Sequence, residues 1–287
     1  MTFSLVGFDD DHMGVATASH WVAVGGIVCW AQAGVGVVAT QAFTQTGFGP
    51  DGLAGLRAGA PALEVANKLL HRDPLPHLRQ LAVLDNHGDI ADHTGSRCLP
   101  EVTVTRHDNA VALGNMLASR TVTEDMIQAW RATDGPLADR LIASLAAGDA
   151  SGGDVRGRQA AAVLVVERTH TGPDAGVVCD LRVDDHADPI NALRELRRIH
   201  TAADALGRVT HPATLGRGPG YEADGREATI VNLSETGGAV REEADLWLAV
   251  LRLIDDDEDA ARVALGHDPA LFTIAKRWAE VLKQAPS

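Results

Sequence analysis

The sequence predicts an α+β fold in which two sheets lie together with helices packed outside them, an αββα layering. Two observations lead to this prediction. Four strand-like segments come before the first clear helix, which argues against a simple alternation of strand and helix. After them the order is helices, a strand pair, a helical segment and a last strand pair, which suits two sheets covered by helices.

The predicted strands are short apolar or β-branched runs bounded by turn residues. They cover residues 2–8, 13–19, 25–30, 34–41, 78–84, 89–93, 110–116, 160–167 and 177–183. The run Gly34–Gln41 is almost continuously apolar, which is typical of a strand buried on both faces. Asp85-Asn86-His87-Gly88 predicts a turn, so the segments on either side of it should form a hairpin.

The predicted helices fall into two groups. Pro50–Ala58 and Pro61–His71 begin with proline near the first turn, and residues 123–145 carry apolar side chains at helical spacing. After Asp188-Pro189 the composition changes, and the remaining helices are predicted at residues 190–206, 242–255, 258–265 and 269–284. Residues 211–225 are rich in Gly and Pro and predict a linker or long loop. We therefore divide the chain into a domain at 1–190 and a helical C-terminal appendage at 191–287.

Composition excludes several classes of partner. Among 287 residues, 39 acidic side chains face 25 basic ones, and a net charge of −14 repels the phosphate backbone of nucleic acids. No apolar run reaches the roughly 18 residues that a membrane helix needs. The opening residues do not form a signal peptide, and three widely spaced cysteines suit buried free thiols in a reducing compartment. We expect a cytoplasmic protein that forms a homo-oligomer, a dimer, and needs no cofactor.

Thr2 is the first candidate for chemistry. A residue as small as threonine normally allows the preceding methionine to be removed, which would leave a hydroxyl and a free α-amine on neighbouring atoms of one residue. An α-amine has a pKa of about 8, so a fraction of it is a neutral base near pH 7. It can take the hydroxyl proton and activate Thr2 as a nucleophile, although an ordinary strand start explains the same residue.

Three other motifs carry candidate site residues. His93 ends a predicted strand and is expected either to move a proton or simply to close a turn. Asn115 follows Gly114 and is expected either to donate to an oxyanion or to form a turn. The loop Gly152–Arg158 contains Asp154 and Arg156, which either shape a pocket for a carboxylate or staple the loop.

A metal site is not expected. Asp180, Asp184, Asp185 and His186 form the densest cluster of potential ligands, but neighbouring residues of a strand point to opposite faces and cannot all converge on one ion. A structural or substrate-facing role is therefore preferred for this cluster.

Six sequence blocks occur in an order that carries a resemblance to a known family. They lie at residues 1–6, 23–42, 93–95 (His-Thr-Gly), 114–117 (Gly-Asn-Met-Leu), 152–159 (Gly-Gly-Asp-Val-Arg-Gly-Arg-Gln) and 180–186 (Asp-Leu-Arg-Val-Asp-Asp-His). Together they closely resemble the bacterial and archaeal family called domain of unknown function 1028, over about residues 1–195. After the second block many relatives carry an Asn and a Tyr-Gly, whereas this chain has Phe43-Thr44-Gln45-Thr46-Gly47-Phe48-Gly49.

The resemblance implies a fold and an activity. The family looks like a branch of the N-terminal-nucleophile hydrolases, whose fold is a four-layer αββα sandwich of two antiparallel sheets. It implies amide hydrolysis, on a small amide or peptide-like substrate, by Thr2, with Asn115 and His93 as the other catalytic residues. The residues expected to contact substrate are Ser19, His20, Gln41, Asp154 and Arg156.

Two competing hypotheses accompany this one. The protein is a binding or structural protein that keeps the sandwich without an active nucleophile, or a metal-dependent hydrolase that uses His93, Asp184 and His186. The fold alone does not choose among the three, because function resides in sites rather than in folds.

Overall fold

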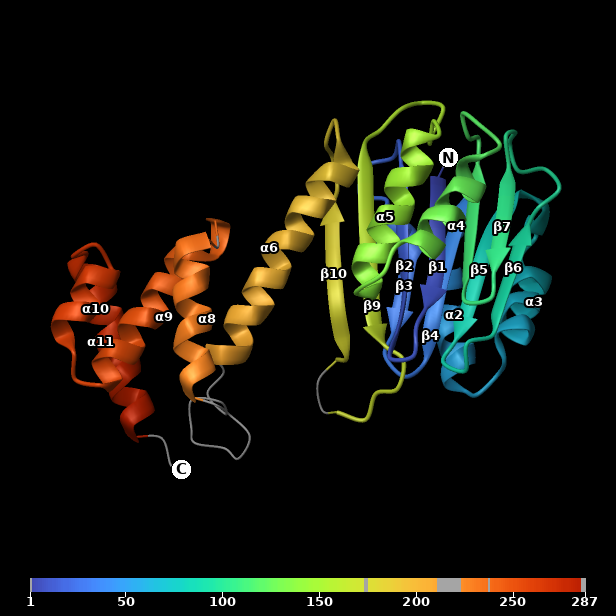
Figure 1. Cartoon of the computed structure of the whole chain (residues 1–287). Helices are drawn as coiled ribbons and strands as arrows, with labels where there is room; N and C mark the ends of the chain where they lie inside the picture. The colour runs from blue at the N-terminus through green and yellow to red at the C-terminus, as the bar shows by residue number, and fades with distance from the viewer. Residues whose placement is uncertain (1, 173–174, 211–222, 237, 285–287) are drawn as a thin grey trace. The chain divides into compact units, whose positions relative to one another are not determined.

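Two antiparallel sheets form the frame of the N-terminal part of the chain (Figure 1). The computed structural model describes residues 2–172, 175–210, 223–236 and 238–284. The first sheet has the order β10-β9-β2-β1-β8-β7 and the second the order β3-β4-β5-β6, with antiparallel pairing throughout. The predicted α+β fold with two antiparallel sheets is therefore confirmed.

The strand bounds agree with the sequence in most places. The strands of the first sheet are β1 (Thr2–Phe8), β2 (His12–Ser19), β7 (Thr103–His107), β8 (Ala110–Asn115), β9 (Ala160–Glu167) and β10 (Val177–Val183). Those of the second sheet are β3 (Cys29–Gln32), β4 (Gly36–Ala42), β5 (Arg79–Asp85) and β6 (Ile90–Thr94). The sheets thus bring together strands from the whole range 2–183.

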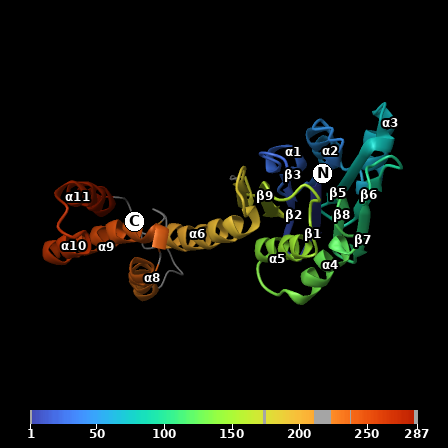
Figure 2. The ribbon, with the colours of Figure 1, turned by 90° about the horizontal axis from the view of Figure 1, so that it is seen from above.

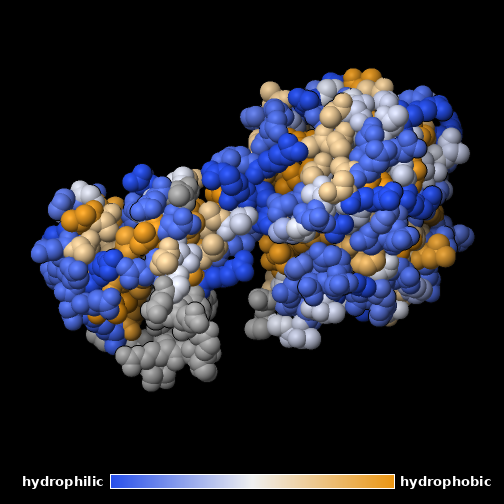
Figure 3. Space-filling view, in the orientation of Figure 1, coloured by the Kyte–Doolittle hydropathy of each residue, from blue (hydrophilic) through white to orange (hydrophobic). Residues whose placement is uncertain are grey.

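The N-terminal part of the chain also contains helices. They are α1 (Gly25–Val28), α2 (Phe48–Arg57), α3 (Ala62–Arg72), a 3₁₀ turn (Pro76–Leu78), α4 (Val122–Ala132) and α5 (Leu137–Ala150). Figure 2 shows α4 and α5 on one side of the strands and α2 and α3 on the other. The face of the N-terminal part of the chain that carries α4 and α5 is mainly hydrophilic, with apolar side chains in small patches (Figure 3).

The alternation of side chains along β1 explains the packing. Phe3 and Leu5 point to one face and join the buried cluster made with α4 and α5, which contains Trp130 and Leu141. Val6 points to the other face and joins a cluster with residues of β4 and β5, so the two sheets bury these faces against each other. Thr2 and Ser4 share the parity of Val6 and therefore face the second sheet.

Three sequence-based expectations need correction. The segment 25–30 is not one strand: Gly25–Val28 is a helical turn and β3 begins at Cys29. This turn places Val24 and Val28 in the cluster between the sheets, and Gly25 packs so closely on Ala162 that a Cβ atom would lie 2.4 Å from its methyl group.

The helix predicted at 123–145 is two helices. Gly135 has φ +102° and Pro136 has no N–H, so α4 and α5 are separated at this point. The strand β7, which was not predicted, lies at the edge of its sheet and is only partly buried, so it lacks a clean apolar pattern.

The chain forms two compact units, Met1–Arg194 and Glu195–Ser287. The described elements of the second unit are helical: the greater part of α6 (Pro189–Thr210), then α8 (Ala223–Thr236), a 3₁₀ turn (Gly238–Val240), α9 (Arg241–Ile254), α10 (Glu258–Ala264) and α11 (Pro269–Gln284). Most of the loop predicted at 211–225 lies outside the described residues. None of the described helices combines the length and the apolar character that crossing a membrane requires.

Candidate functional site

Thr2 lies at the beginning of the central strand β1, between the ends of its two neighbours. It pairs with Asn115 at the end of β8, and its Oγ1 donates a hydrogen bond of 3.3 Å to Oγ of Ser19 at the end of β2. The residue is 5% exposed. Because the neighbouring strands are antiparallel to β1, their last residues and Thr2 meet at one edge of the sheet.

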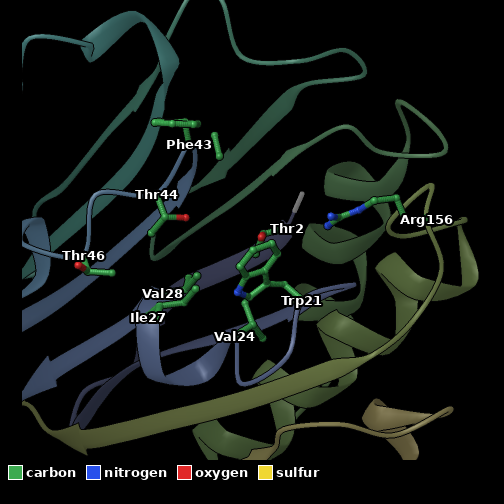
Figure 4. Close-up of a pocket in the computed structure, with 10 residues that line it drawn as sticks. Thr2, Trp21, Val24, Ile27, Val28, Phe43, Thr44, Thr46 and Arg156 are labelled. Atoms are coloured by element: carbon green, nitrogen blue, oxygen red, sulfur yellow. The ribbon is translucent and has the colours of Figure 1, made fainter.

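A cavity of about 410 Å³ opens beside Thr2 (Figure 4). Its walls come from the segment after β2, from α1, from the segment after β4 and from the loop before β9. The lining residues are Thr2, Trp21, Val24, Ile27, Val28, Ala42, Phe43, Thr44, Thr46 and Arg156. This is the size of a small-molecule site, with apolar walls and a few polar groups.

Two buried amide side chains form hydrogen bonds with the main-chain carbonyl oxygen of Thr2. Nε2 of Gln41 lies 3.3 Å from the Thr2 carbonyl oxygen, and Nδ2 of Asn115 lies 3.4 Å from the same oxygen. Both amides also donate to Oε1 of Gln80, over 2.8 Å from Gln41 and 3.0 Å from Asn115. Ser4 completes this amide network with a 2.6 Å hydrogen bond to Oε1 of Gln41.

The amide network joins the two sheets with neutral groups. Its members Ser4, Gln41, Gln80 and Asn115 are at most 2% exposed, and their side chains form hydrogen bonds with neutral side chains and main-chain atoms. Each buried polar group therefore has a hydrogen-bond partner, as a stable interior requires. The network holds the Thr2 main chain in a fixed position without placing a charge next to it.

Asp154 fixes the loop that carries Arg156. The Asp154 side chain is 2% exposed and accepts hydrogen bonds of 2.8 Å from the main-chain N–H groups of His20 and Arg156. It also binds the Arg156 guanidinium, with 3.1 Å between Oδ2 and Nη2 and 3.3 Å between Oδ1 and Nε. In Figure 4 the guanidinium points from the loop toward Thr2.

Residues with a strained backbone conformation lie close to the cavity. Among the described residues of the first unit, those with positive φ other than glycine are Ala23 at +54°, Ala42 at +69° and Met116 at +49°. Ala42 lines the cavity, Ala23 precedes the lining residue Val24, and Met116 follows Asn115. Residues with a side chain rarely adopt this conformation, and such strain concentrates at functional sites.

A second cavity of about 270 Å³ adjoins the first. The two share Ala42 and Phe43, and the second also contains Asn115 and Met116. Its other lining residues are Leu78, Arg97, Cys98 and Leu99. Phe43 thus lies between two hollows at the same end of the sheets.

A buried ion pair anchors the Phe43 segment. Arg79 donates to both oxygens of Asp73, over 2.5 and 3.0 Å, and also to the main-chain oxygen of Phe43. Its guanidinium lies 5.4 Å from the centre of the Phe43 ring, a cation–π contact. The hydrogen bond from Arg79 lowers the pKa of Asp73. Nearby, burial raises the pKa of the Cys98 thiol, which donates to the Arg79 carbonyl oxygen.

The structure brings together most of the predicted site residues. Thr2, Ser19, Gln41 and Asn115 are in direct contact or share a partner, and Arg156 with its support Asp154 completes one wall. His93 and His20 do not line either of these cavities. The His93 ring lies on β6 with Nε2 2.9 Å from the Pro76 oxygen, and the His20 ring has Nδ1 3.2 Å from the Arg158 oxygen.

Other site residues carry no recognisable motif. Trp21, Thr44 and Thr46 were not predicted as site residues, and Gln80 was read only as part of a strand. The sequence offered one signal for two of the lining residues: in a chain with 4% aromatic residues, Trp21 and Phe43 both follow a predicted strand closely. In the structure their side chains are 56% and 63% exposed.

The acidic cluster near β10 has structural partners. Gln159 Nε2 lies 3.2 Å from Asp185, and the main-chain oxygen of Asp184 accepts from the N–H of Ala23. His186 Nδ1 accepts from the N–H of Asp188. No group of three or more His, Cys, Asp or Glu within the described part of the chain is placed to hold a metal ion.

The fold and the site define an α+β protein of two antiparallel sheets with a cavity of about 410 Å³ at the start of its central strand. The sequence model of the family of unknown function DUF1028 matches residues 2–193, and the chain belongs to this family. The predicted membership is therefore confirmed.

Two solved structures illustrate the comparison. The crystal structure of a DUF1028 protein from Silicibacter pomeroyi is 33% identical, with a TM-score of 0.63 over 70% of this chain and 86% of that one. Anbu, the ancestral beta-subunit from Yersinia bercovieri, is 11% identical, with a TM-score of 0.36 over 70% of this chain and 96% of that one. No protein with curated function matches the chain.

Proposed function

We propose that the protein is an amidohydrolase that uses Thr2 as an N-terminal nucleophile on a small amide or peptide-like substrate. The observation that carries the proposal is the position of Thr2: it opens the central strand, and it lines a cavity of about 410 Å³ with mainly apolar walls. We also propose that the two sheets and their helices form the αββα sandwich of N-terminal-nucleophile hydrolases.

The proposed reaction begins when cleavage before Thr2 leaves its α-amine free. The amine accepts the proton of the Thr2 hydroxyl as Oγ1 attacks the substrate carbonyl carbon. The tetrahedral intermediate collapses when the C–N bond breaks, and the departing amine takes the proton. Water then cleaves the Thr2 ester, releases a carboxylic acid and restores the hydroxyl.

The surrounding groups have distinct supporting roles in this proposal. Ser19 accepts from the Thr2 hydroxyl and orients it toward the cavity. Asn115 already donates toward the Thr2 carbonyl oxygen and Gln80, so we assign it to holding the strand end. A main-chain N–H of the cavity wall then stabilises the oxyanion, the role in which such donors are most effective.

The test compares Thr2 variants after the mature N-terminus has been established by intact mass. Thr2→Ala should lose at least about a thousandfold in kcat on any amide that the wild type hydrolyses, because it lacks the nucleophile. Thr2→Ser should retain part of the activity. Thr133→Ala removes a threonine hydroxyl at the end of α4, outside the cavity, and serves as the matched control.

Two results would contradict the proposal. Equal turnover by wild type and Thr2→Ala would show that Thr2 is not the nucleophile. A mature chain in which a residue still precedes Thr2, together with no turnover of any amide, would favour the binding-protein hypothesis instead.

A further inference from the structure

We propose that the substrate is an N-acylated amino acid, held by its carboxylate at Arg156 and by its acyl chain against Val24, Ile27 and Val28. This inference rests on the proposed function and names the substrate class of that same site.

Charge is the first argument. Among the described residues that line the cavity beside Thr2, Arg156 is the charged one, in a protein with a net charge of −14. Its side chain is 33% exposed, whereas the Asp154 that holds it is 2% exposed and does not line the cavity. The cavity therefore presents the cation to a ligand and keeps the balancing anion behind it.

The guanidinium is also oriented in advance. Arginine carries five N–H groups in a planar fork that matches the two oxygens of a carboxylate. Asp154 binds through Nε and Nη2, and it fixes the main chain of Arg156 as well. An arginine held on a buried carboxylate loses little side-chain freedom when a ligand binds, which favours binding.

The arrangement around Thr2 is the second argument. In Figure 4 the Thr2 hydroxyl lies between the Arg156 guanidinium on one side and the apolar group of Ile27 and Val28 on the other. Val24 and Val28 are each 1% exposed, so this wall is part of the rigid core between the sheets. A ligand that places its carbonyl group at Thr2 would therefore fit best with a charged group on the Arg156 side and an apolar group on the side of Ile27 and Val28.

An N-acyl amino acid satisfies both requirements at once. Its α-carboxylate is attached to the carbon next to the scissile nitrogen, so one compact cavity can hold the carboxylate and the carbonyl together. The acyl chain extends from the other side of the carbonyl, toward the apolar wall. Attack by Thr2 breaks the amide C–N bond and forms the acyl ester, and the amino acid leaves with the proton on its nitrogen. Water then releases the fatty or aryl carboxylic acid.

The test uses matched pairs of substrates that differ only in the carboxylate. N-hexanoyl derivatives of glycine, alanine, leucine, phenylalanine and glutamine are each compared with the corresponding α-carboxamide. The wild type should prefer the acid by about ten- to a hundredfold in kcat/KM, the value of hydrogen bonds to a charged group. Arg156→Met should reduce this ratio to nearly one, and Arg156→Lys should retain part of it.

Arg158→Met is the matched control. Arg158 lies in the same loop and pairs with Asp149, with 2.7 Å between Nη2 and Oδ2, but it does not line the cavity. The ratio of acid to carboxamide should not change in this variant. A ratio is measured within one protein, so it is insensitive to a general loss of stability when the Asp154 contact is removed.

Different results separate this inference from the proposed function. If the wild type hydrolyses acids and carboxamides equally well, the carboxylate assignment is wrong and the nucleophile assignment stands. A preference for N-hexylsuccinamic acid, which carries its carboxylate on the acyl side, would also overturn the assignment to an amino acid.

Binding decides the case in which nothing is hydrolysed. Calorimetric titration of the N-hexanoyl amino acids should then still show binding to the wild type and to Arg158→Met, and none to Arg156→Met. The absence of binding to the wild type, or binding that is equal in all three proteins, would overturn the inference.

Discussion

The side chain of Gln41 connects three neighbouring strands at the site. Its side chain is fully buried and bonds to Ser4 on β1, to Gln80 on β5 and to the main-chain oxygens of Thr2 and Leu113. An amide is well suited to this place because it donates and accepts at once and carries no charge. Its fully satisfied contacts give the end of β1 a defined position between the two sheets.

Replacing Gln41 with leucine should therefore damage both stability and activity. The substitution removes the hydrogen bonds that Gln41 makes with Ser4, with Gln80 and with the main-chain oxygens of Thr2 and Leu113, and each buried hydrogen bond contributes about 0.5–1.5 kcal/mol. We expect the free energy of unfolding to fall by roughly 2–4 kcal/mol in urea titrations. Gln128→Leu, an exposed position on α4, should change it by less than about 0.5 kcal/mol. A Gln41→Leu protein as stable as the wild type would show that the amide network contributes nothing.

At the residue scale the sequence could identify chemical groups but not their partners. Thr2 is predicted from its hydroxyl and Asn115 from its place after Gly114 near the end of an apolar run, and both lie at the cavity end of the sheets. The same kind of reasoning selects His93, yet its ring, which extends from β6 in the second sheet, lies 2.9 Å from the main-chain oxygen of Pro76. Whether a histidine faces a cavity or a neighbouring turn depends on strand pairing, which a local pattern does not contain.

Helices and strands were predicted best where a charged residue or a glycine marks their boundary. The strands β1, β9 and β10 begin and end at the predicted residues, because apolar runs stop at charged or glycine-containing turns. The apolar composition of Gly25–Val28 fits both a strand and a helical turn, and periodicity does not separate the two over four residues. The edge strand β7 was missed for the opposite reason: its partly buried side chains are not mainly apolar.

The joint between α3 and β5 should make stability depend on pH. Asp73 ends α3, Arg79 begins β5, and the ion pair between their side chains is 1% and 5% exposed. Because the hydrogen bond from Arg79 lowers the folded pKa of Asp73, the pair stabilises the fold above the unfolded pKa of about 4 and loses this effect as the pH falls through the folded value.

Asp73→Asn isolates this contribution. At pH 7 it should lower the free energy of unfolding by about 3 kcal/mol, because a buried guanidinium loses its anion. The difference from wild type should shrink as the pH falls below about 4, where Asp73 of the unfolded chain becomes protonated, toward the lower folded pKa of Asp73. Asp134→Asn, at an exposed position between α4 and α5, is the control and should show no such trend. A constant difference between pH 7 and pH 3 would contradict the assignment.

For the whole molecule, the division into two units leads to a proposal about independent folding. The apolar residues Ile190 and Leu193, at the start of α6, are 3% and 0% exposed and belong to the cluster made with α4 and α5. The first unit therefore needs the first turns of α6. The predicted domain boundary after residue 190 lies within these turns. The composition change at Asp188-Pro189 marks where the helix starts, not where the core ends.

Two fragments test this proposal. A chain of residues 1–196 should melt in one cooperative transition, because the core clusters of the first unit are complete within it. A chain of residues 1–189 should be less stable by about 3 kcal/mol or more, since it lacks two buried aliphatic side chains. If the longer fragment shows no cooperative melting, the first unit does not fold alone. If the two fragments melt alike, α6 contributes nothing to this core.

The contrast between the neutral amide network and the charged Arg156 has a consequence for ionic strength. Dissolved ions screen exposed charges over about 10 Å at 0.1 M salt, but they act little on hydrogen bonds between buried uncharged groups. Added salt should therefore weaken the capture of an anionic ligand at Arg156, whose side chain is 33% exposed, and leave the geometry around Thr2 unchanged. A rise in KM with constant kcat would then be the sign that one half of the site responds to its ionic surroundings and the other does not.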